Sequence, residues 1–176
     1  MNDNELLPID RFLATLEIVS REGRHLHYSY GRLFSSNIDE AWVKRLDVDP
    51  ELAEGLEAFV SRFGRMQDTM ADKLLPRWLL ALAETPGSQI ETLNKAEKLG
   101  VIESVEQWLQ ARRLRNVLIH EYMVSEADFA VNLLQAKQYC QLFTDCFNRV
   151  RDFSEFRMGI DKQHLPAPLT LRENEQ

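Results

Sequence analysis

The side chains best suited to chemistry lie close together in one segment, residues 115–122. An arginine can hold a phosphate through paired hydrogen bonds. A histidine can accept or donate a proton near neutral pH, and a tyrosine offers a hydroxyl that can act as a nucleophile or be modified. The segment carries Arg115, Asn116, His120 and Tyr122 within two turns of a predicted helix. We therefore expect the chemistry of the protein to lie here.

A helical arrangement divides these four side chains between two faces. At about 100° per residue, Arg115 and Tyr122 fall on the apolar face of the helix, whereas Asn116 and His120 share another face. Arg115 and His120 are then about 140° apart on a straight helix. One straight helix does not bring them together, so a site needs a helix end or bend near His120, or a second protomer.

Each residue also has a purely structural interpretation. Arginine is rarely buried without a partner, so Arg115 can pair with an acid of the preceding long helix, and the sequence leaves Asp68 and Asp72 open. His120 can be a residue at a helix C-terminus, where a positively charged histidine is favoured. Tyr122, on the apolar face, can be a core or interface tyrosine.

Long amphipathic helices account for most of the remaining sequence. Apolar residues recur at helical spacing, and no alternating strand pattern competes with them. Asp49-Pro50, Ser88, Ser104 and Ser125 are helix-start signals, and Pro76 should kink or restart the third helix. The sequence predicts an all-α fold, an up-and-down bundle of four main helices with additional short helices. The predicted helices cover residues 8–34, 37–46, 50–84, 89–99, 105–122 and 126–156.

The chain is expected to form one helical domain over residues 1–163, because 176 residues suffice for one domain with a sizeable core. From His164 to residue 176 the sequence is polar and contains proline. We expect this C-terminal tail to be mobile.

The overall charge argues against a general nucleic-acid binder. The chain has a net charge of −7 and a pI of about 5.2, whereas such proteins usually present a basic face. A small basic site within an acidic surface stays compatible with this composition.

The cysteines and histidines predict neither a metal site nor a cofactor. Cys140 and Cys146 do not form a CxxC pair, and the four histidines have no zinc-ligand spacing. Two reduced, partly buried thiols are typical of a cytoplasmic protein. The acidic start of the chain shows no secretory signal, and the longest apolar run, near residues 78–83, is too short to span a membrane.

The segment 115–122 resembles the signature of the HEPN superfamily. That signature is an arginine, usually followed by a small polar residue, with a histidine four to six residues further on, and Arg115-Asn116 and His120 match it. With Tyr122 the pattern is similar to the Arg-x4-His-x-Tyr form of HepT-like proteins, the toxins of HEPN/MNT toxin–antitoxin pairs. The segment 63–68 resembles the corresponding helix less specifically.

The resemblance implies a homodimer with a shared cleft and metal-independent cleavage of RNA. Arg115 is then expected to hold the scissile phosphate and stabilise its developing charge. His120 is expected to act as general acid or base, and Asn116 to orient the phosphate or His120. The implied partner is an MNT-type nucleotidyltransferase antitoxin, which can attach AMP to Tyr122 and so block RNA by charge and bulk.

Two other functions stay open at this point. One is a non-catalytic substrate-binding subunit of a nucleotidyltransferase complex, which the acidic composition slightly favours. The other is a helical scaffold in which the motif only packs. The intact set of Arg115, His120 and Tyr122 favours the RNA-cleaving toxin.

Overall fold

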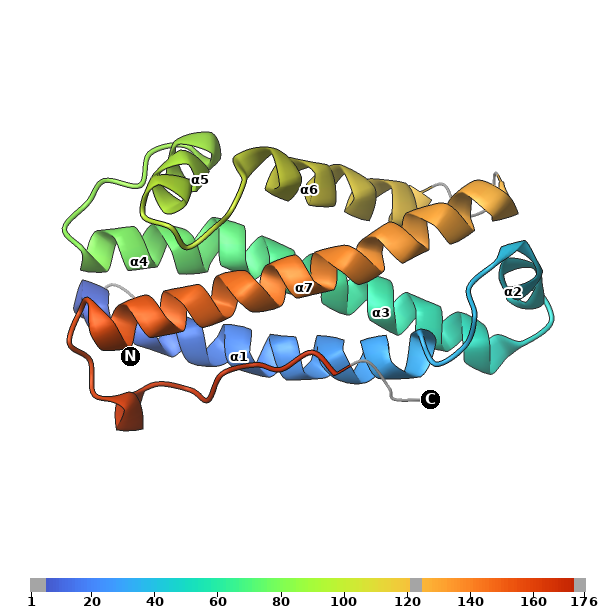
Figure 1. The fold of residues 1–176 in the computed structure, drawn as a ribbon, viewed down its shortest axis with the longest axis horizontal. Helices are drawn as coiled ribbons and strands as arrows, with labels where there is room; N and C mark the ends of the chain where they lie inside the picture. Colours follow the sequence, from blue (N-terminus) through green and yellow to red (C-terminus); the bar gives the residue numbers. More distant parts are fainter. Residues whose placement is uncertain (1–5, 121–124, 173–176) are drawn as a thin grey trace.

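A computed structural model describes residues 6–120 and 125–172, and this part of the chain contains helices but no strand. The helices follow one another in the order shown in Figure 1. They are α1 (Pro8–Leu33), α2 (Glu40–Arg45), α3 (Pro50–Thr69), a π-helical turn η1 (Met70–Leu74), α4 (Leu75–Ala81), α5 (Gln89–Lys98), α6 (Val105–His120), α7 (Glu126–Phe156) and a 3-10 turn η2 (Lys162–His164).

Four long rods run up and down and form the body of the molecule (Figure 1). They are α1, the combined helix α3–η1–α4, α6 and α7, with α2 and α5 as short helices near the two ends. The prediction of an all-α, up-and-down bundle with four main helices is confirmed. None of the described helices has both the length and the apolar character needed to cross a membrane.

Polar side chains begin the helices where the sequence predicts. The Asp49 carboxylate accepts a hydrogen bond from the Leu52 amide, with Pro50 in the first turn. Ser88 forms a reciprocal capping box with Glu91. The hydroxyl of Ser125 likewise accepts from an amide in the first turn of α7. These caps fix the first residues of α3, α5 and α7.

The long middle rod is interrupted at Pro76, as the sequence predicts. Proline has no amide hydrogen and its ring crowds the preceding turn. The turn before it, η1, is π-helical and therefore contains one more residue than a regular helical turn would. The rod continues as α4 beyond this turn, where Trp78 is completely buried.

A chain of aromatic contacts joins the four main helices in the core. Phe34, directly after α1, packs edge-on against Phe59 of α3. Phe63, one turn further along α3, contacts Phe143 of α7, which in turn contacts Trp108 of α6, with ring centroids 5.0 and 5.3 Å apart. Aromatic pairs at these distances add specific geometry to apolar burial. Trp108 thereby anchors the helix that carries Arg115.

Residues 164–172, for which the sequence predicts a mobile tail, lie against the bundle. Beyond α7 the chain turns back and runs along α1 (Figure 1). Leu165 and Leu169 are buried, and the Asn148 side chain bonds the backbone of Leu169. The polar composition of this segment does not predict that it docks on the bundle, because its leucines are few and widely spaced.

Both cysteines of α7 are buried and free. Burial raises the pKa of the Cys146 thiol to about 12 and raises that of Cys140 as well. Neither thiol therefore ionises near neutral pH, and their role in this structure is to fill the core.

The half-buried His27 should make stability depend on pH. It lies 2.9 Å from the Thr144 hydroxyl, and burial lowers its pKa below the ordinary 6.5, outweighing a hydrogen bond with the Thr170 backbone. A lowered folded-state pKa means that the unfolded chain binds the proton more readily. The contribution of neutral His27 to the free energy of unfolding is therefore complete above pH 6.5 and decreases as the pH falls below it.

Urea unfolding at pH 7.5 and 5.5 tests this expectation. His27→Gln should reduce the loss of unfolding free energy between the two pH values. The exposed His164 is the matched control, and His164→Gln should leave that loss unchanged. Equal losses in the wild type and the His27→Gln variant would contradict the assignment.

Candidate functional site

An open groove with a volume of about 680 Å³ lies between α3 and the motif helix α6. One end of α2 contributes to it. Its apolar lining consists of Leu46, Ala53, Leu56, Val60, Leu118 and Ile119, and its polar lining of Glu57, Ser61, Arg65, Asp68, Thr69, Asp72, Lys73 and Arg115. A groove with an apolar part and a few charged groups suits a ligand or a second protein chain.

The polar wall of the groove comes from one side of the middle rod. Arg65, Asp68 and Thr69 recur at the three- and four-residue spacing of a helix face, and Asp72 and Lys73 continue the same series into η1. This spacing of polar residues is the sequence signal for the wall. The contributions of Arg65, Thr69 and Lys73 were not predicted.

Arg115 reaches across the groove to α3 and forms an ion pair with Asp68. Its Nη2 atom lies 3.2 Å from the Asp68 Oδ2 atom. The Arg115 side chain is 31% exposed and the Asp68 side chain 46%. Solvent therefore screens the ion pair, and breaking it costs little free energy. Of the two acids that the sequence left open, the structure selects Asp68. Asp72 instead accepts a hydrogen bond from the side-chain amide of Gln89 at 2.6 Å.

Gly64 provides the space in which Arg115 lies. A Cβ atom at this position would be 2.8 Å from the Arg115 Nε atom and 3.3 Å from its Cγ atom. The Nε atom is buried here and has no hydrogen-bond partner. The missing side chain at Gly64 therefore lets Arg115 lie directly on α3, within reach of Asp68 one turn further on. The sequence shows a glycine inside a helix, which alone signals only a weaker helix.

Asn116 and His120 lie away from the groove. Both are exposed, and neither belongs to the groove lining. This agrees with the predicted division of the motif between two faces of one helix. The structure brings Arg115 together with Asp68, but not with His120. Tyr122 lies outside the described residues.

Charges of both signs are balanced around the groove. Arg65, Lys73 and Arg115 oppose Glu57, Asp68 and Asp72 in its lining. Behind this wall, Glu22 of α1 accepts a hydrogen bond from the Thr69 hydroxyl at 2.9 Å. Burial raises the pKa of Glu22, while the hydrogen bond from Thr69 and the charges of Arg65 and Lys73 lower it.

Within residues 6–120 and 125–172, no three or more His, Cys, Asp or Glu side chains form a cluster that could hold a metal ion. In comparisons with protein-family models, curated proteins and solved structures, nothing matches this chain.

Two glycines of α3 test how tightly Arg115 is seated. Gly55 has open space around its missing side chain, so Gly55→Ala should stabilise the protein by about 0.5–1 kcal/mol through helix propensity. Gly64→Ala should gain less, or destabilise, because its methyl group displaces Arg115 from Asp68. Urea unfolding measures both changes, and equal stabilisation by the two substitutions would contradict the proposed seat.

Proposed function

We propose that the protein is a HEPN-type endoribonuclease toxin that acts as a homodimer. The observation that carries the proposal is the seat of Arg115: its guanidinium is fixed on α3, yet remains partly exposed in an open groove. Asn116 and His120 follow on the same helix with exposed side chains. Metal-independent RNA cleavage needs a cation that stabilises the phosphate charge and a group that transfers protons, and Arg115 and His120 are residues of these two types.

The proposed reaction is transfer of the RNA phosphate to the neighbouring ribose oxygen. A base removes the proton of the 2′-OH, whose oxygen attacks the adjacent phosphorus. The bond from phosphorus to the 5′-oxygen breaks, and that oxygen takes up a proton, leaving a 2′,3′-cyclic phosphate and a 5′-OH. Arg115 stabilises the charge on the phosphate. His120 acts in one of the two proton transfers, and Asn116 orients the phosphate or His120.

A second protomer supplies what one chain lacks in this proposal. Arg115 points into the groove while His120 is exposed on another face, so a single α6 does not present both to one phosphate. Ile119 lies between these faces and is 45% exposed although apolar. Covering Ile119 and the apolar lining of the groove would favour a symmetric pairing around α6.

The proposed regulator is an MNT-type nucleotidyltransferase that attaches AMP to Tyr122. In the sequence this tyrosine comes two residues after His120. The added phosphate is negative, so it would compete with RNA for Arg115 and block approach to His120. This regulation rests on the resemblance of the segment 115–122 to the Arg-x4-His-x-Tyr form.

A second candidate is a non-catalytic, substrate-binding subunit of a nucleotidyltransferase complex. The Arg115–Asp68 ion pair favours it, because a guanidinium that already has a carboxylate partner is less available to a phosphate. The equal numbers of positive and negative side chains in the groove also favour this second candidate, because they give the groove no net attraction for polyanionic RNA. Both candidates use the groove, but only the toxin needs His120.

Expression without the nucleotidyltransferase separates the two candidates. The wild type should arrest growth and degrade RNA. Arg115→Ala and His120→Ala should each restore growth and lower the cleavage rate of the purified protein by about 100-fold or more. Arg113→Ala, a substitution of an exposed arginine on the same helix, is the matched control and should remain toxic. Intact RNA and normal growth with the wild type would refute the toxin proposal.

Asp68 should restrain the affinity of the groove for RNA. Asp68→Asn removes the partner of Arg115, and a screened ion pair of about 0.2–1 kcal/mol predicts affinity higher by about 1.4- to fivefold. Asp72→Asn changes the charge equally in the same groove, but leaves the Arg115 contact intact. Fluorescence anisotropy with a labelled RNA, in the His120→Ala background, measures both. Equal gains would indicate a general charge effect.

A further inference from the structure

The segment that follows α7 has the character of a bound peptide. After α7, backbone hydrogen bonds from Met158 and Ile160 to the end of the helix close a short turn. After the 3-10 turn η2 the chain runs along α1 (Figure 1). We call residues 162–172 the strap. Within it, Leu165 and Leu169 are buried, whereas the residues between them are exposed or half-buried.

The sequence of the strap prepares it for this extended state. Its centre reads Leu165-Pro166-Ala167-Pro168-Leu169. The two prolines fix their own φ angles, and each restricts the preceding residue to extended conformations. The backbone of Leu165 is extended accordingly. In a polyproline-type helix, rising about 3.1 Å per residue, the two leucines are about 12 Å apart. Little conformational entropy is then lost when the segment docks.

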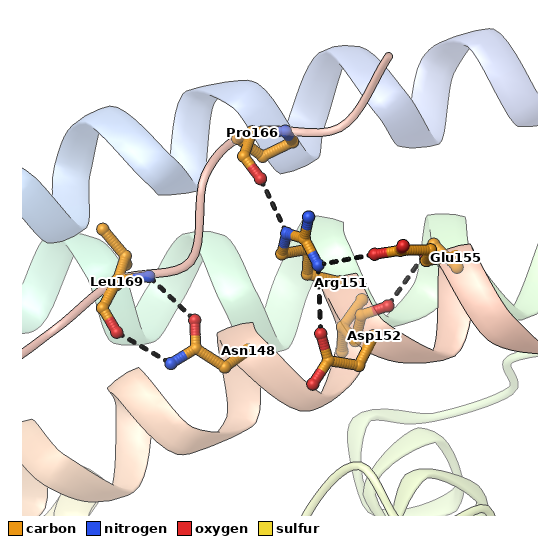
Figure 2. A network of polar contacts seen from close by, with 8 residues as sticks. Asn148, Arg151, Asp152, Glu155, Pro166 and Leu169 are labelled. Carbon is orange, nitrogen blue, oxygen red and sulfur yellow. Dashed lines mark hydrogen bonds and ion pairs between the residues drawn. The ribbon is translucent and has the colours of Figure 1, made fainter. Parts of the chain in front are cut away.

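Two side chains of α7 recognise the main chain of the strap. Asn148 accepts a hydrogen bond from the Leu169 amide and donates one to the Leu169 carbonyl, both at 2.8 Å (Figure 2). Arg151 donates from Nε to the Pro166 carbonyl at 2.8 Å. Its other side is held by Glu155 at 2.9 Å, and only 11% of the side chain is exposed. The side chains of Asn148 and Arg151 are thus positioned to hydrogen-bond to an extended backbone.

Leu169 fills a socket that depends on a glycine. A Cβ atom at Gly23 of α1 would overlap the Leu169 Cδ1 atom and lie 3.3 Å from the Met66 Cε atom of α3. Gly23 lies inside a regular helix, where an alanine would be more favourable. The strap leucine therefore gives a physical reason for the missing side chain at this position.

From these contacts we propose that the surface between α1 and α7 is a docking site for an extended Leu-Pro-x-Pro-Leu peptide, and that the strap is its tethered, releasable occupant. The partner it accepts in trans is a protein segment with the same two leucines and two prolines. The strap itself shows this chemistry seated in the site. Because the strap is tethered at an effective concentration on the order of millimolar, a partner binds well only when the strap is displaced.

Peptide binding to the full chain tests the proposal. A labelled peptide of residues 162–172 should bind a strap-released variant, Leu165→Asp/Leu169→Asp, at least tenfold more tightly than the wild type, whose site is occupied. Adding Asn148→Ala to the released variant should weaken binding about tenfold by removing two hydrogen bonds. A folded released variant that does not prefer this peptide over one carrying Leu169→Asp would overturn the proposal.

Two further measurements keep the test decisive if the double variant does not fold. Hydrogen exchange of the wild type should show the Leu169 amide opening without opening of α7; exchange only through global unfolding would show that the strap is not releasable. Gly23→Ala should speed this exchange and still refuse the peptide, because the socket is filled. Gly55→Ala, which meets no neighbour, is the control and should leave the exchange of Leu169 unchanged.

Discussion

The aromatic contacts in the core hold three of the main helices, α3, α6 and α7, in a fixed relation to one another. The rings of Phe59, Phe63, Phe143 and Trp108 connect α3, α7 and α6 in one series. Close-packed rings of this size tolerate little rotation of the helices that carry them. Arg115 lies two turns after Trp108 on the same inner side of α6. The core therefore holds the stem of Arg115 close to α3, where Gly64 leaves space for it and Asp68 pairs with its charge.

The main elements and part of the site could be predicted from the sequence, because each has a local signal. Helical spacing and the caps at Asp49, Ser88 and Ser125 mark the rods and their starts. The apolar surroundings of Arg115 in the sequence already place it toward the bundle and require an acid. The choice of Asp68 depends on the distance between two helices, which no local pattern contains. For the same reason the roles of Gly64 and the strap could not be predicted. They depend on which segments pack against the glycine and against the two leucines, and the local sequence does not contain this information.

Glycine plays the same part on the two sides of the bundle. On one side Gly64 admits the stem of an arginine, and on the other Gly23 admits a leucine of the strap. In both places a helix gives up some intrinsic stability so that another segment can approach its backbone. The first approach fixes a charged group beside an open groove, and the second closes an apolar surface. The missing side chains of these two glycines therefore shape the bundle, as its buried side chains do.

The π-helical turn at residues 70–74 links the groove to the far end of the rod. One extra residue in a helix turns everything beyond it by about 100° relative to an uninterrupted helix. Asp72 and Lys73 lie in this turn and line the groove, while Trp78 beyond it is buried against Phe153 of α7. If the same residues formed an uninterrupted α-helix, the groove wall and the tryptophan would not both face as they do. The relation between the two faces is therefore set by the number of residues in this turn.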